Sequence, residues 1–231
     1  MRTLVATSLV LEPLVAAHAR EMFEVLSDPA IYEFENSPPS SAEWLEERYR
    51  RLEQRGPASG SEKWLNWAIR RPTGELAGYI QATVLQDNTS LVAYGLNSRY
   101  WRQGLASSAV QTMLEELSGR YRVQTFVAVL KATNYRSSGL LRTLGFAQAS
   151  DQLATRFKDE PDELVMVKCS SGTENAAQHV GQPDGLRRGT LAPKCSLSMF
   201  RRAAKAPRFR TQVASTPEHH QESDSEQTRS D

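Results

Sequence analysis

The residues best suited to chemistry lie in a short turn, 101–107, that joins a strand-like segment to a helix-like one. Gly104 has no Cβ, so a ligand can approach the backbone closely there, and Ala106 and Ser107 are also small. The first N–H groups of a helix lack internal partners and carry the positive end of its dipole. Such a helix start binds phosphate readily, and Arg102 could add a charge-assisted contact. The turn therefore fits a pyrophosphate site, although a glycine at a helix start is also common for structural reasons alone.

A second polar helix start follows a buried strand-like run, 30 residues after Gly104, and begins with Asn134. A polar side chain in that place can reach a ligand held between two strands. Asn134 is equally an ordinary helix-capping residue, so both roles stay open. The turn at Gly104 lacks the three glycines of a dinucleotide fingerprint and the Gly-Lys-Ser/Thr of a P-loop. The sequence thus argues against nucleotide oxidoreductases and NTPases.

These two helix starts need a sheet to hold them, and hydrophobic spacing predicts one. Alternating or β-branched runs predict strands at 8–14, 64–70, 76–85, 91–96, 123–130, from 146 onward and at 163–168. Helical spacing predicts helices at 15–26, 42–55, 104–117 and 134–144. This order is typical of an α/β or α+β fold in which helices cover a layered sheet.

Together these residues resemble the GNAT family of N-acetyltransferases, most closely the branch that modifies the N-termini of ribosomal proteins. The resemblance covers about residues 8–168. It rests on Trp101, Gly104 and Ala106, on Asn134, Ser137, Gly145 and Phe146, and on Leu9, Leu11, Pro13 and the run Ser27, Asp28, Pro29. Two positions depart from the family: Ser8 stands where the family has Arg, and Leu141 where the wider family has Tyr. The segment after Phe146 is also short compared with the branch, so the ribosomal substrate does not follow from the resemblance.

The resemblance implies the acyl-CoA N-acyltransferase fold, a mixed, mostly antiparallel sheet with helices on both faces. It implies direct transfer of acetyl from acetyl-CoA to a primary amine, a protein N-terminus or a small molecule, within a ternary complex and without a metal. The residues expected to bind acetyl-CoA are Leu96, Asn97, Arg102, Gln103, Gly104, Leu105, Ala106, Ser107 and Asn134. A non-catalytic acyl-CoA-binding module on the same fold is the alternative.

Three residues are the foremost catalytic candidates. Ser137 is expected to protonate or hydrogen-bond the departing thiolate, because the family's tyrosine is missing. The amine must also lose a proton, so a base or a water chain is needed. Glu35 and Tyr94 are candidates for that base, and Glu33 and Asp151 are further candidates.

Composition divides the chain into an N-acetyltransferase domain at 1–169 and a tail at 170–231. The tail holds few clustered apolar residues, which cannot offset its ordering entropy, so the sequence predicts that it is disordered. Cys169 and Cys195 come too late to form a disulfide framework, which favours a reducing compartment. With no signal peptide or apolar span recognised, we expect a cytoplasmic protein. A net charge of +1 argues against nucleic acid or membrane as a partner, and a monomer or homodimer is expected.

Overall fold

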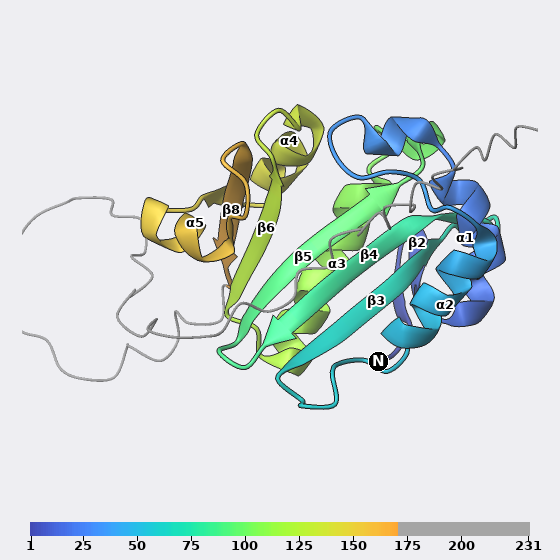
Figure 1. Ribbon diagram of the computed structural model, residues 1–231, viewed down its shortest axis with the longest axis horizontal. Helices are drawn as coiled ribbons and strands as arrows, with labels where there is room; N and C mark the ends of the chain where they lie inside the picture. Colours follow the sequence, from blue (N-terminus) through green and yellow to red (C-terminus); the bar gives the residue numbers. More distant parts are fainter. Residues whose placement is uncertain (171–231) are drawn as a thin grey trace, which may run out of the picture. The chain divides into compact units, whose positions relative to one another are not determined.

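Eight strands form one sheet in the order β1-β2-β3-β4-β5-β6-β8-β7 (Figure 1). A computed structural model of the protein describes residues 1–170, and the predicted tail from residue 171 lies outside them. The strands are β1 (Leu4–Ala6), β2 (Leu9–Pro13), β3 (Glu62–Arg70), β4 (Leu76–Leu85), β5 (Thr89–Leu96), β6 (Thr125–Lys131), β7 (Ala147–Gln148) and β8 (Glu163–Cys169). The helices are α1 (Ala19–Leu26), α2 (Ala42–Leu52), α3 (Leu105–Tyr121), α4 (Tyr135–Thr143) and α5 (Asp151–Phe157), and single 3₁₀ turns occur at Ala16–His18, Pro29–Tyr32 and Ser98–Tyr100.

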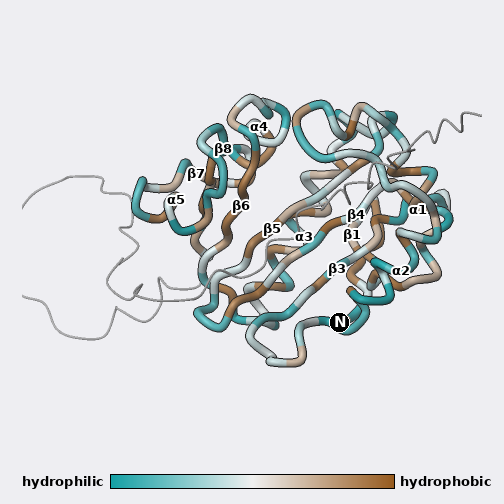
Figure 2. Tube along the Cα trace, in the orientation of Figure 1, coloured by the Kyte–Doolittle hydropathy of each residue, from teal (hydrophilic) through white to brown (hydrophobic). Residues whose placement is uncertain are grey.

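Helices cover both faces of this sheet. On one face α3 packs against the strands through a core that includes Trp67, Ile80 and Met113, all fully buried. On the other face α1 and α2 pack over Ala68 and Leu76. The tube in Figure 2 shows the hydrophobic residues concentrated along the inner strands. The predicted fold class, a mixed and mostly antiparallel sheet with helices on both faces, is confirmed.

Two elements were not predicted. Strand β1 has only three residues, too few for a periodic pattern to be recognised. Helix α5 is short, yet it carries a signal that could have revealed it: Ser150 is the N-cap, and its side chain accepts a hydrogen bond from the Leu153 N–H at 3.4 Å. The helix predicted at 15–26 begins instead as a 3₁₀ turn and becomes α-helical at Ala19.

The sheet opens between β5 and β6. Among the described strands these two form the parallel pair, and they are joined through three residue pairs, from Thr89 with Thr125 to Leu91 with Val127. Beyond that point β5 continues alongside β4, and β6 continues alongside β8 as far as Lys131. The facing edges of β5 and β6 are therefore not paired with each other in their second halves.

Candidate active site

The open edge of β5 offers backbone N–H groups to the β5–β6 gap. The Asn97 N–H donates to the Ala77 carbonyl at 3.0 Å, so this residue faces β4. Alternate residues of an antiparallel ladder point their hydrogen-bonding groups to opposite sides. The N–H groups of Leu96 and Tyr94 therefore point toward the β6 side, where no strand is paired with them.

The predicted phosphate turn forms at the start of α3. Gly104 is the N-cap and adopts the left-handed conformation, with φ of 75°. A Cβ built at Gly104 would meet no atom within 4 Å, so the space above the turn is open. Helical hydrogen bonding begins where the Ser108 N–H donates to the Gly104 carbonyl at 3.0 Å. The N–H groups of the three residues between them thus have no helical acceptor, as a phosphate cradle requires.

The strand end beside this turn is held firmly. The Trp101 indole Nε1 donates to the Leu96 carbonyl at 2.8 Å. The buried Asn97 side chain donates to the Val25 carbonyl at 2.9 Å and accepts from the Arg99 N–H at 3.2 Å. Since both the backbone N–H and the side chain of Asn97 have protein partners, this residue shapes the site rather than presenting donors to it. The N–H groups of Leu96 and Tyr94 are left as the donors on the gap side of this strand end.

Asn134 caps α4 across the gap. Its Oδ1 accepts the Ser137 N–H at 3.0 Å, so the capping role left open by the sequence is present. The Nδ2 group remains for other contacts. The exposed side chain of Gln103 folds back and donates to the Arg99 carbonyl at 2.9 Å, and Arg102 is exposed beside it.

Two predicted catalytic residues from different elements lie close together. The Tyr94 hydroxyl is buried and has no hydrogen-bond partner within the described residues. Burial raises the pKa of Tyr94, and the Ser137 side chain lies near enough to oppose that rise. A buried polar group without a partner is rare and costs stability. The structure thus places a buried phenol from β5 next to a hydroxyl from α4.

Glu35 lies in the loop that follows α1, near the ends of β6 and β8. Glu35 keeps contact with solvent, but desolvation by the surrounding protein raises the pKa of its carboxyl. Lys131 opposes that rise, and the carboxylates of Glu163 and Asp162 add to it. Asp151, by contrast, lies in the first turn of α5, where a carboxylate suits the helix dipole.

Sequence reasoning missed Tyr79, whose ring lies across β5. A Cβ at Gly95 would come within 2.6 Å of the Tyr79 ring, so only glycine fits beneath it. Burial raises the pKa of Tyr79, with Arg48 opposing the rise and Glu35 adding to it. Tyr79 belongs to the α1–α2 face, whereas Tyr94 packs on the α3 face. The glycine inside a predicted strand was the signal for this close approach.

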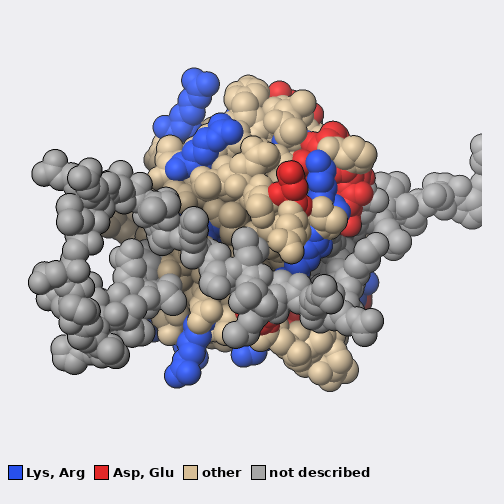
Figure 3. All heavy atoms as spheres, turned by 90° about the vertical axis from the view of Figure 1, so that its left-hand side faces the viewer, with Lys and Arg blue, Asp and Glu red and all other residues tan. Residues whose placement is uncertain are grey.

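Acidic side chains gather near the end of β6. The Lys131 Nζ forms ion pairs with Glu160 and, at 2.9 Å, with Asp162. The space-filling view of the α5–β8 side shows a cluster of acidic side chains on this face (Figure 3). Together with Glu33 and Glu35 in the loop after α1, these residues place more carboxylates than cations near the end of β6. We call this region the rim.

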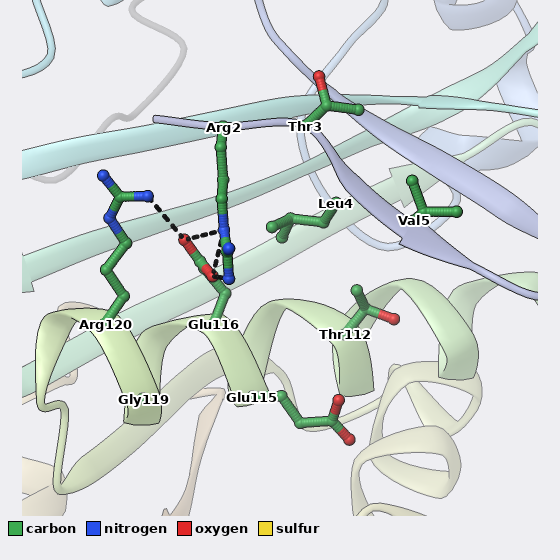
Figure 4. Close-up of a pocket in the computed structure, with 9 residues that line it drawn as sticks. All are labelled: Arg2, Thr3, Leu4, Val5, Thr112, Glu115, Glu116, Gly119 and Arg120. Carbon is green, nitrogen blue, oxygen red and sulfur yellow. Dashed lines mark hydrogen bonds and ion pairs between the residues drawn. The ribbon is translucent and has the colours of Figure 1, made fainter.

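A separate pocket lies between β1 and the second half of α3 (Figure 4). There the Arg2 guanidinium donates hydrogen bonds of 2.6 to 3.2 Å to the buried carboxylate of Glu116, and Arg120 lies 3.9 Å from the same carboxylate. None of the predicted site residues lines this pocket. Its ion pairs tie the N-terminus to α3.

In the described part of the chain, no group of three His, Cys, Asp or Glu side chains is arranged to hold a metal ion. Within residues 1–170 there is also no helix with the length and apolar character needed to cross a membrane.

Comparison with known proteins identifies the family. A model described as the acetyltransferase (GNAT) domain matches residues 8–147, and the chain belongs to this family. It is an acetyl-CoA-dependent N-acetyltransferase, the enzyme class that the motifs predict. A search of curated proteins finds no match.

Solved structures share the fold at low sequence identity. A ribosomal-protein-S5-alanine acetyltransferase from Vibrio fischeri matches with a TM-score of 0.61 and 13% identity, over 74% of this chain and 97% of that one. RimL, a ribosomal L7/L12 alpha-N-protein acetyltransferase in complex with coenzyme A, matches with 0.60 and 17%, over 71% and 96%. A spermidine N-acetyltransferase from Vibrio cholerae, with CoA and spermine, matches with 0.57 and 14%, over 71% and 96%.

Proposed function

We propose that the protein transfers the acetyl group of acetyl-CoA directly to a primary amine, with both substrates bound at the β5–β6 gap. One observation carries this proposal: the unpaired edge of β5 leads to the left-handed turn at Gly104. Unsatisfied N–H groups of a strand edge and of a helix start therefore follow one another along a single path. A molecule with an amide-containing arm and a pyrophosphate matches both sets.

In this arrangement the N–H groups of residues 103–107 hold the pyrophosphate, with Arg102 beside them. The pantetheine arm lies along β5, and the Leu96 N–H polarises the thioester carbonyl, an oxyanion-type role. Asn97 keeps this strand end in place. The Nδ2 group of Asn134 contacts the arm from the α4 side.

The chemical step joins the amine nitrogen to the acetyl carbon and breaks the bond from that carbon to sulfur. Glu35 takes a proton from the amine, either directly or through water, and Ser137 donates to the departing thiolate. The Tyr94 phenol lies beside Ser137 and supplies a second donor, which offsets the missing tyrosine on α4. Alignment of the amine and the thioester in one gap accounts for much of the rate gain.

The acceptor that suits the rim is a cationic amine. Near the end of β6 the carboxylates of Glu33, Glu35, Glu160 and Asp162 outnumber the two cations beside them, Arg136 and Lys131. A net acidic entrance attracts cations. Solved structures with this fold include a spermidine N-acetyltransferase with spermine, a ribosomal-protein-S5-alanine acetyltransferase and a ribosomal L7/L12 alpha-N-protein acetyltransferase. We therefore propose a polyamine or a protein N-terminus as the acceptor class.

The test begins with the melting temperature of the full chain with and without excess acetyl-CoA. A ligand at about 100 times its dissociation constant adds about 2.7 kcal/mol of stability, which shifts Tm by several degrees. Spermine and peptides with free N-terminal Ala or Ser are then screened for thiol release. No Tm shift at millimolar acetyl-CoA would overturn the cofactor site. A clear shift without thiol release from any amine would favour the non-catalytic binding module.

A further inference from the structure

One side chain, Arg136 at the start of α4, contacts two separate segments near the open end of the gap and the ring of its own neighbour, Tyr135. Its Nη1 forms an ion pair with Glu33 Oε2 at 2.5 Å. Its guanidinium carbon lies 5.4 Å from the ring centre of Phe34, 4.8 Å from that of Trp101 and 5.1 Å from that of Tyr135. We call this group the Arg136 clasp.

The clasp joins parts that the sheet does not join. Trp101 is fixed to the end of β5 through its hydrogen bond to the Leu96 carbonyl, whereas Arg136 follows β6. Strand pairing between β5 and β6 has already ended at Leu91 and Val127. Arg136 therefore connects the two sides of the gap beyond their last paired residues.

The clasp also fixes the segment 33–36, which we call the acceptor loop and which carries Glu35. The Phe34 ring meets the exposed Tyr135 ring edge-on, with centroids 5.8 Å apart and planes at 87°. Aromatic pairs in this geometry attract each other. The acceptor loop is thus held to α4 by the ion pair of Arg136 with Glu33 and by the contacts of the Phe34 ring with Arg136 and Tyr135.

We propose that Arg136 is a positioning residue that holds the acceptor loop over the β5–β6 gap and so places Glu35 for the incoming amine. This inference rests on the proposed function, because it assigns a role at the same site. Arg suits the task since a planar guanidinium stacks on rings while it donates to a carboxylate, which the ammonium of Lys cannot do as well. The half-exposed ion pair alone would be weak, so the ring contacts are a necessary part of the clasp.

The experiment compares five variants of the full chain with the wild type: Arg136→Met, Arg136→Lys, Glu33→Gln, the double exchange Glu33→Arg with Arg136→Glu, and Arg142→Met as the matched control. Arg142 lies on the same helix outside the clasp. Three quantities are measured: the Kd of acetyl-CoA by calorimetry, the hydrogen exchange of the amides in 33–41 other than Pro38 and Pro39, and kcat and KM for the amine found in the thiol-release screen.

In Arg136→Met we expect exchange of amides 33–41 about tenfold faster and acceptor KM about tenfold higher, since an ion pair and ring contacts are lost together. The Kd of acetyl-CoA should stay within about twofold, because the N–H groups at Gly104 do not depend on the clasp. Arg136→Lys and Glu33→Gln should fall in between, and the double exchange should recover part of the loss.

Two results would overturn the clasp: unchanged exchange and KM in Arg136→Met, or an equal change in Arg142→Met. A joint fall in Tm, kcat and acetyl-CoA affinity in Arg136→Met would show a general structural role instead. If the wild type itself fails to bind acetyl-CoA, the proposed function fails, and the exchange of amides 33–41 still shows whether Arg136 holds the loop.

Discussion

The two sides of the β5–β6 gap are built in different ways. On the β5 side the groups aimed at the gap are backbone N–H donors, held by Trp101, Asn97 and the left-handed Gly104. On the other side, near the end of β6, the polar groups are charged side chains: Glu35, Arg136 and the carboxylates near Lys131. The first side is fixed by main-chain geometry, whereas the second depends on ion pairs that respond to pH and salt. A common co-substrate suits the first arrangement, and a variable acceptor suits the second.

The largest effect is expected on the backbone side. Gly104→Glu should weaken acetyl-CoA binding by about 100-fold or more, because a side chain strains the left-handed turn and a carboxylate repels the pyrophosphate. Calorimetry gives the Kd. Gly119→Glu is the matched control, since it makes the same change in an open position at the far end of α3. Equal affinities for the two variants would show that the turn at Gly104 does not bind acetyl-CoA, and the contrast between the two sides of the gap would fail.

The hydroxyl pair lies where the two sides meet. Replacing Ser137 by Ala together with Tyr94 by Phe should lower kcat by about 10- to 100-fold, because proton donation to the thiolate is lost. The Kd of acetyl-CoA should change little. Ser138→Ala is the control, since that buried hydroxyl donates to the Tyr135 carbonyl at 3.2 Å. A double variant with unchanged kcat would show that solvent supplies this proton.

A smaller effect is expected from Glu35, and it should depend on pH. As the proposed base, Glu35 works only when deprotonated, and desolvation raises its pKa above the ordinary 4.5. Activity should therefore fall as the pH falls through this raised pKa, and Glu35→Gln should lack that limb. The pH profile of kcat/KM measures it, with the exposed Glu24→Gln as control. An unchanged limb in Glu35→Gln would assign the base to another group.

The smallest effect concerns the helix that leads to the acceptor loop. Burial lowers the pKa of His18 below its ordinary 6.5, although nearby Glu12 opposes this. The folded state therefore prefers the neutral ring, and stability is lost as the pH falls from 6.5 through the lowered pKa. The Tm should drop less in His18→Gln than in the wild type between about pH 7.5 and about pH 5.5. Parallel curves would show that His18 does not contribute.

The same contrast explains what could be predicted from sequence. Gly104 and Asn134 leave local traces, because a left-handed turn and a helix cap each restrict the residue type at one position. The contact between Arg136 and Glu33 joins residues 103 positions apart in the chain, so no local sequence pattern predicts it. The rise in the Glu35 pKa likewise depends on Lys131 and on carboxylates near β8, which only the fold brings near. The sequence therefore predicted the two helix starts at Gly104 and Asn134, but it did not predict the side-chain contacts of Arg136 and Glu35.

The sheet order has a further consequence for how the protein is made. From β1 to β5 the order of strands in the sheet follows their order in the chain, so each new strand can pair with the one before it as synthesis proceeds. Strand β6 must instead wait for the α3 crossover, and its long antiparallel partner β8 is the last strand of the described residues. Non-local pairing of this kind forms slowly. The gap thus lies between a part of the sheet built from strands that follow one another in the chain and a part built from non-local pairs, and the proposed reaction takes place at that junction.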